Sequence, residues 1–172
     1  MTKSISPPTI ILRTELAGYI ILGLLLAALL AIDCYFLIQG EFNKPIVLLA
    51  FAGFTIFVFV LLLNYFRTTI VIDKYSISFQ NLFKQKTIAF LNVYKVETIS
   101  KIKSVSNHGV DSKMAMMLFS YDDVLEIPIK YFSKKSLTIL GKTIVSKCQK
   151  AEINRLTILM SEGQMPSLFR TK

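Results

Sequence analysis

The chain has 172 residues, a hydrophobic content of 53% and a formal net charge of +9. A mean hydropathy of +0.54 is difficult to reconcile with that charge in one soluble domain, whereas the length suits one ordinary domain plus a small membrane unit. Residues 1–66 contain three basic and three acidic residues, so residues 67–172 carry the whole net charge. This division predicts an apolar N-terminal part followed by a basic domain.

Two apolar segments in the N-terminal part are long enough to cross a membrane. Residues 16–38 contain one ionisable side chain, Asp33, and in residues 46–63 the one polar side chain is Thr55. A helix needs about 20 apolar residues to cross a bilayer core. The 14 Ile, Leu, Val and Phe residues of the second segment favour its insertion by about 4 to 8 kcal/mol. We therefore predict a two-helix membrane hairpin over residues 16–66, against the alternative of two buried helices in a soluble protein.

The charges around these segments predict their orientation. Lys3 and Arg13 precede the first segment and Arg67 directly follows the second, whereas the connecting loop has one lysine and one glutamate. Because basic residues are retained on the cytoplasmic side, both termini are expected in the cytoplasm and the short loop outside. Cys34 and Cys148 would then lie on opposite sides of the membrane, which excludes a disulfide between them.

Small residues and a single acid mark the two apolar segments of the predicted hairpin. The small residues are Gly23, Ala27 and Ala31 in the first segment and Ala50 and Gly53 in the second. Such a strip lets helices approach closely in lipid, either within the hairpin, which the short loop favours, or with a neighbouring subunit. The intramembrane acid Asp33 suits an interfacial side chain better than a proton or ion site, because it lies near a helix end and the other segment has no ionisable partner.

Short segments with alternating polar and apolar residues follow Arg67. The alternation is clearest from Tyr75 to Gln80, and Asp73-Lys74 before it is typical of a tight hairpin turn. Further strands are expected over residues 70–72, 86–90, 95–105, 114–119 and 125–129, with turns at residues 81–85 and 121–123. The sequence thus predicts a meander of six or seven antiparallel strands.

An amphipathic helix is predicted after the last strand. Ser133 suits an N-cap with a hydrophobic staple between its flanking residues, and Gly163 suits a C-terminal stop. One long helix or a broken pair of helices is expected to reach Glu162. A second apolar stripe beyond residue 150 comprises Ile153, Leu156, Leu159 and Met160. This stripe is either a surface for a protein partner or a part of the core that folds back on the domain.

The order of these parts, together with two stretches of sequence, resembles the bacterial pleckstrin-homology-like membrane proteins, including the YcxB-like branch. The stretches are Thr69-Ile-Val-Ile-Asp73 with Tyr75-Ser-Ile-Ser-Phe79, and Leu125-Glu-Ile-Pro-Ile-Lys-Tyr-Phe-Ser133. The resemblance implies an α-helical membrane hairpin with an α+β cytoplasmic domain, a pleckstrin-homology-like antiparallel β-barrel or sandwich capped by a C-terminal helix. It implies the bacterial cytoplasmic membrane as location and no catalytic residues. The expected division is residues 1–15 as a cytoplasmic tail, 16–66 as the hairpin, 67–150 as the β-domain with its helix, and 151–172 as an extension beyond the resemblance.

Groups of residues that catalysis or metal binding would need do not occur in the sequence. His108 is the single histidine, and the adjacent Asp122 and Asp123 suit a turn better than an acid–base pair. The sequence also lacks a glycine-rich phosphate loop, a nucleophile motif and a metal-type cysteine spacing. We therefore expect no enzyme activity, no metal and no cofactor.

Lysines are the remaining signal for binding. The candidate contacts with lipid headgroups are Lys74, Lys84 and Lys86 around the first hairpins and Lys134 and Lys135 in the first turn of the helix. Cations are disfavoured at that end of a helix, whereas each lysine near an anionic leaflet contributes about 1 kcal/mol to binding. A solvated basic face is the simpler interpretation. Nucleic acid is not an expected partner, because the chain lacks tryptophan and any arginine cluster and is tethered to a membrane.

Three functional hypotheses remain. The first is a membrane-anchored, non-catalytic interaction module, a subunit or assembly factor whose partner is a membrane protein or a second copy of the chain. The second is a sensor of anionic lipid on the inner leaflet. The third, a small oligomeric transporter component using Asp33, ranks last because two spans with one acid provide little material for a translocation path.

Overall fold

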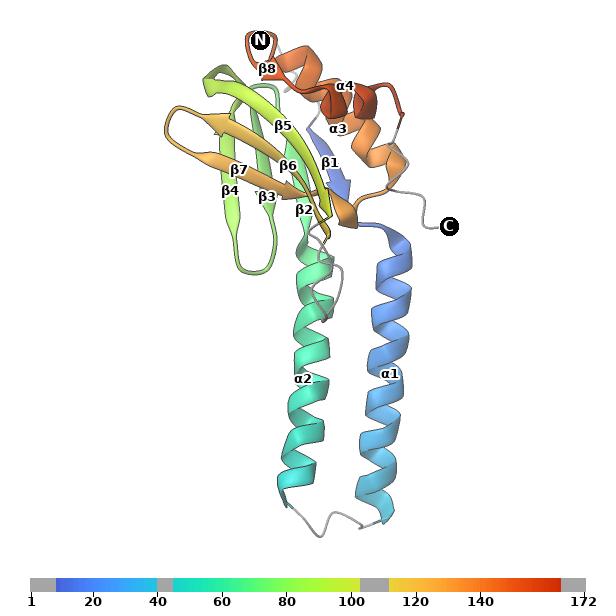
Figure 1. The fold of residues 1–172 in the computed structure, drawn as a ribbon. Helices are drawn as coiled ribbons and strands as arrows, with labels where there is room; N and C mark the ends of the chain where they lie inside the picture. The colour runs from blue at the N-terminus through green and yellow to red at the C-terminus, as the bar shows by residue number, and fades with distance from the viewer. Residues whose placement is uncertain (1–8, 40–44, 103–111, 165–172) are drawn as a thin grey trace, which may run out of the picture. The chain divides into compact units, whose positions relative to one another are not determined.

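A computed structural model describes residues 9–39, 45–102 and 112–164 (Figure 1). The chain divides into two compact units. The helical unit contains the described residues of 14–68 together with residues 81–83, and the α+β unit contains residues 9–13, 69–80 and the described residues from 84 onward. Each unit is therefore assembled from segments that are separated in the sequence.

The helical unit consists mainly of two apolar helices, α1 (Leu16–Gln39) and α2 (Pro45–Arg67), which lie side by side and antiparallel (Figure 1). Within them, Leu16–Phe36 and Leu49–Arg67 are long and apolar enough to cross a membrane. Only 6% of each segment is buried inside the structure, whereas a core helix of a soluble domain is mostly buried. The predicted pair of membrane-capable helices is thus confirmed.

The first sheet has four antiparallel strands in the order β1-β2-β3-β4. These strands are β1 (Ile10–Arg13), β2 (Thr69–Ile72), β3 (Ser76–Gln80) and β4 (Gln85–Ala89). Strands β1 and β2 pair with Arg13 opposite Thr69 and Ile10 opposite Ile72. β1 precedes α1 in the chain and β2 follows α2. The helical pair therefore forms the connection between two strands that are hydrogen-bonded to each other in one sheet.

The second sheet has the order β7-β6-β5-β8 and is mixed. Its strands are β5 (Val93–Ile102), β6 (Ser112–Ser120), β7 (Val124–Pro128) and the two-residue β8 (Glu152–Ile153). β5 pairs antiparallel with β6 but parallel with β8. Two 3-10 segments, η1 (Phe90–Asn92) and η2 (Ile129–Tyr131), precede β5 and follow β7.

Two helices complete the α+β unit, α3 (Lys134–Lys147) and α4 (Arg155–Ser161). The predicted cap of α3 is confirmed, since Ser133 Oγ accepts a hydrogen bond from Ser136 N at 3.2 Å. Gly163 has a φ of +76°, a left-handed conformation that suits the end of a helix. Buried side chains from both sheets and both helices form one hydrophobic core, which contains Ile77, Leu118, Ile127, Leu140, Ile144 and Met160 among others.

The structure differs from the sequence-based expectation in three respects. Residues 10–13 form β1 instead of belonging to an N-terminal tail, and the meander gains a parallel strand, β8. In the described part of the chain the two sheets are open, so of the two expected forms, barrel or sandwich, the closed barrel is wrong. The chain passes from the first sheet to the second through η1, which lies between β4 and β5 and contains the buried Phe90. Strands β4 and β5 do not pair with each other, and each belongs to its own sheet.

Candidate functional site

Asp33 is held between the two apolar helices. Thr55 Oγ1 on α2 donates a hydrogen bond to Asp33 Oδ2 at 2.7 Å. Asp33 Oδ1 is buried and has no hydrogen-bond partner among the described residues. The sequence-based interpretation considered ionisable partners and therefore missed the hydroxyl of Thr55. A hydrogen bond between membrane helices contributes on average about 0.6 kcal/mol, which is enough to favour one register of the pair.

The surroundings of this polar pair are apolar. A depression beside Thr55 is lined otherwise by Leu26, Leu30, Ile56 and Phe59. These side chains offer an ion or a polar solute no ligand except the Thr55 hydroxyl. The arrangement therefore suits helix pairing better than a translocation path.

The predicted strip of small residues does not lie at the contact between α1 and α2. A Cβ atom added to Gly23 or Gly53 would meet no atom of the partner helix within 4 Å. Ala27, Ala31 and Ala50 are exposed. The preferred interpretation, packing within the hairpin, is not supported for either glycine, because no atom of the partner helix lies close to its position. The alternative, contact with a neighbouring subunit, remains a prediction.

The close approach of the helices occurs instead at Gly18, which the sequence analysis did not single out. A Cβ atom added there would lie 2.3 Å from the Tyr65 ring. Tyr65 and Phe66 both pack on Tyr19, with ring centroids 4.9 and 4.4 Å apart. Thr14 Oγ1 donates a hydrogen bond to the Tyr65 carbonyl at 3.2 Å. The end of the helical pair that adjoins β1 and β2 is thus fixed by aromatic contacts that the spacing of residues in the sequence did not reveal.

The five candidate lysines do not form a single site. Strand β3 separates Lys74, which precedes its first residue, from Lys84, which follows its last, and five strand residues cover about 17 Å. Lys74 Nζ lies 4.8 Å from the centroid of the Tyr75 ring. Lys134 and Lys135 are exposed in the first turn of α3. The lysines are therefore distributed over several elements of the α+β unit.

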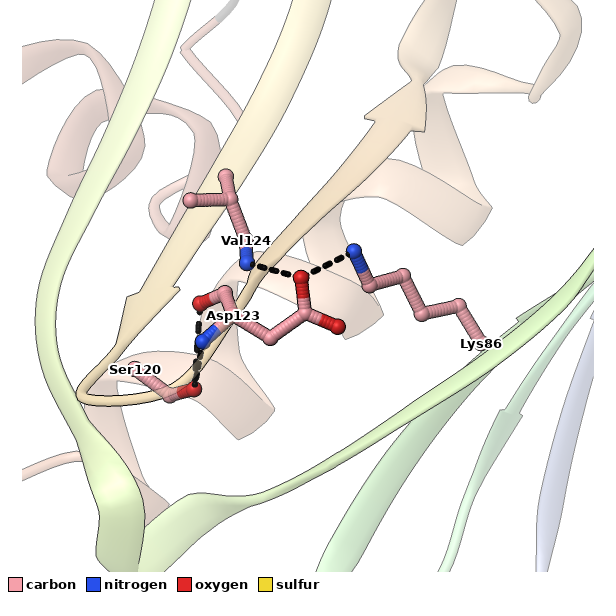
Figure 2. A network of polar contacts seen from close by, with 4 residues as sticks. All are labelled: Lys86, Ser120, Asp123 and Val124. Carbon is pink, nitrogen blue, oxygen red and sulfur yellow. Dashed lines mark hydrogen bonds and ion pairs between the residues drawn. The ribbon is translucent and has the colours of Figure 1, made fainter.

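Lys86 has a structural partner, which Figure 2 shows. Its Nζ forms an ion pair with Asp123 Oδ1 in the turn between β6 and β7, and the same oxygen accepts a hydrogen bond from Val124 N at 2.8 Å. The hydrogen bond with Lys86 holds the pKa of the Asp123 carboxyl below its ordinary value. Because β4 belongs to one sheet and the turn to the other, the pair joins the two sheets, which makes Lys86 less available to a lipid headgroup.

The apolar stripe beyond residue 150 docks on the domain. Met160 is 1% exposed within the core, and Ile153 packs against that core. Leu156 and Leu159 are half-buried. The prediction of a partner surface is wrong for Met160, because α4 lies against α3 with its Met160 side turned to the core, and the alternative of a segment folded back on the domain holds.

Asn154 secures this docking, although the sequence analysis did not single it out. Its Oδ1 accepts hydrogen bonds from Thr98 N at 3.1 Å and Thr157 N at 3.1 Å, and its Nδ2 donates to Thr98 O at 2.9 Å. The Thr98 and Thr157 hydroxyls are hydrogen-bonded at 2.7 Å. Asparagine is a preferred N-cap residue. Its position before Arg155 was therefore a signal in the sequence that a helix begins there.

Groups that could bind a metal or act in catalysis do not converge in the described ranges. Within them, no three His, Cys, Asp or Glu side chains lie close enough to hold a metal ion. His108 lies outside the described residues. Burial raises the pKa of the Cys148 thiol to about 11, which disfavours the reactive thiolate. The geometry of the described residues thus suits packing and surface contact.

Comparisons with protein-family models, curated proteins and solved structures found no match. The structure itself defines a class of protein in which two membrane-capable helices connect two paired strands of an α+β domain. The resemblance to bacterial pleckstrin-homology-like proteins stays a prediction.

Proposed function

We propose that the chain is a two-pass protein of the bacterial cytoplasmic membrane whose α+β domain is a non-catalytic interaction module in the cytoplasm. The module would serve as a subunit or assembly factor of a membrane complex. The observation that carries this proposal is the insertion of the helical pair between the paired strands β1 and β2.

The register between β1 and β2 supports the topology of this proposal. Arg13 and Thr69 lie opposite each other, and opposed residues of antiparallel strands have Cα atoms about 4.5–5.5 Å apart. A chain that leaves the sheet at one of them and returns at the other crosses the membrane an even number of times. The domain would then be attached to the membrane at two neighbouring points, and the basic residues around it support a cytoplasmic location.

The arrangement of the α+β unit supports the proposed pleckstrin-homology-like fold. Four antiparallel strands form one sheet, and three further antiparallel strands form most of the second. The helix α3 follows the last of these strands and contributes Leu137, Leu140 and Ile144 to the common core. This order of parts is the one that the resemblance implies, with β1 as an addition before α1 and with β8 and α4 as additions after α3.

The lipid-sensor hypothesis has less support than the interaction module. Its five lysines are distributed over separate elements, and Lys86 is paired with Asp123. The transporter hypothesis also has less support, because Asp33 between the helices is hydrogen-bonded to Thr55 beside an apolar depression. Neither arrangement provides a preformed site for a headgroup or an ion.

Thiol labelling in intact cells is expected to show the loop outside and the domain inside. In a cysteine-free background, an Asn43→Cys variant should react with a membrane-impermeant maleimide, whereas a Tyr121→Cys variant should react only after permeabilisation. Tyr121 is 82% exposed, so its protection in intact cells would report the membrane. Cys148 is unsuitable as a reporter because it is 2% exposed. Labelling at position 121 with protection at position 43 would reverse the orientation.

The outward-facing small residues are expected to contact a second membrane helix. Ala27→Leu should dissociate the complex seen after gentle solubilisation, because the added bulk prevents close approach in lipid. Ala28→Leu is the matched control, since Ala28 is also exposed but its side chain points about 100° away around the helix. Native gel electrophoresis of both variants would measure the assembly. A wild-type chain that migrates as a lone 19.5 kDa protein would exclude this part of the proposal.

A further inference from the structure

The turn between β3 and β4 belongs to the helical unit. Residues 81–83 group with α1 and α2, although the strands on either side of the turn do not. Leu82 N donates a hydrogen bond to Asn64 Oδ1 on α2 at 3.1 Å. Phe83 N donates a hydrogen bond to Asn81 Oδ1 at 2.9 Å, and this local bond fixes the backbone of residues 81–83. The turn is therefore held at a defined place beside α2.

The position of Asn64 places this turn at the depth of the apolar segment. The membrane-capable part of α2 ends at Arg67, and Asn64 precedes that residue by three positions. Three residues of an α-helix rise by about 4.5 Å. The backbone of Leu82 therefore lies within the last turn of the apolar segment.

The side chain at the tip of the turn is apolar and uncovered. Phe83 is 73% exposed. The exposed Phe66 lies in the same last turn of α2 and packs on Tyr19, which Tyr65 also contacts, so the three rings form an aromatic group at that end of the helical pair. Aromatic side chains at the end of a membrane span are typical of the level of the lipid headgroups. In the sequence, Lys84 follows Phe83 directly, as basic residues do on the cytoplasmic side.

We propose that the 81–83 turn is a third membrane contact, in which Phe83 inserts into the boundary between the headgroups and the acyl chains of the cytoplasmic leaflet. The inference rests on the proposed function only in that α1 and α2 cross the membrane. The partner is the phospholipid bilayer itself. Insertion would remove an exposed phenylalanine from water while the Asn64–Leu82 hydrogen bond keeps the turn at the required depth.

Single-tryptophan variants of the full chain in lipid vesicles can test this contact without background, because the natural sequence has no tryptophan. The probe is Phe83→Trp. Phe57→Trp, in the middle of the exposed face of α2, is the control for the span, and Tyr121→Trp, on the turn between β6 and β7, is the exposed control outside the helical unit. Each variant is reconstituted into phosphatidylcholine–phosphatidylglycerol vesicles whose lipids are brominated either near the headgroup end or near the methyl end of the acyl chains.

An interfacial side chain lies about 5–10 Å into the headgroup–acyl boundary, so Phe83→Trp should lose at least about half of its fluorescence with the shallow bromines and much less with the deep ones. Phe57→Trp should show the reverse order, and Tyr121→Trp should respond to neither. If Phe83→Trp behaves as Tyr121→Trp does while Phe57→Trp is quenched by deep bromines, the membrane contact is overturned and the span stands. If Phe57→Trp is not quenched, the span itself fails. Shielding of Phe83→Trp from iodide in water without quenching by either lipid would assign the turn to a protein contact and would also overturn the proposal.

Discussion

Asn154→Ala is expected to lower the free energy of unfolding of the α+β unit by at least about 3 kcal/mol. The substitution removes the N-cap of α4, which contributes about 1 kcal/mol. It also leaves the backbone N–H and C=O of Thr98 without their side-chain partner, and each unsatisfied buried group costs about 1–3 kcal/mol. Thr98 and Thr157 are 6% and 0% exposed, so water does not readily replace the amide.

Guanidinium unfolding of the full chain in mild detergent, followed by the circular dichroism of the β-sheets, would measure this loss. Asn92→Ala is the control, because Asn92 is exposed in η1 and a surface substitution changes stability by no more than about 0.5 kcal/mol. Asn154→Asp should fall between the two, since a carboxylate retains the cap of α4 but cannot donate to Thr98 O. Equal midpoints for Asn154→Ala and Asn92→Ala would show that the network contributes nothing to docking.

Met160→Ala is expected to lower the free energy of unfolding by about 2–5 kcal/mol, because truncation of a fully buried methionine removes apolar contacts and leaves a cavity. Met160 is 1% exposed, and it packs where α4 lies against α3. The backbones of these helices come close at Gly141, where an added Cβ would lie 2.8 Å from Ser161 N. Such tight contact limits the collapse that would otherwise fill the cavity.

The matched control for Met160→Ala is Ile158→Ala on the same helix. Ile158 is 41% exposed, so Ile158→Ala should lower the stability less than Met160→Ala does, since much of the Ile158 surface stays in water after folding. Thermal unfolding of both variants in the same detergent would separate them. If Met160→Ala kept wild-type stability and instead lost a bound protein, the stripe would be a surface for a protein partner. The docked position of α4 would then be wrong.

The sequence by itself determined the elements whose signals are local. The two apolar segments were long enough to identify α1 and α2, and the alternation from Tyr75 to Gln80 identified β3. The cap at Ser133 and the glycine at position 163 bounded the helical region. These predictions succeeded because length, alternation and capping depend on neighbours within a few residues along the chain.

Tertiary structure decided the features that depend on residues far apart in the sequence. Residues 10–13 became a strand only through pairing with residues 69–72, on the other side of both apolar helices. The partner of Asp33 is 22 positions away, and the close approach of Gly18 to Tyr65 depends on how α1 packs against α2. Met160 entered the core because Asn154 binds the backbone of Thr98, which lies 56 positions earlier. An apolar stripe has the same spacing whether it is covered by its own domain or by a partner, so only the packing of α4 on the domain distinguished the two.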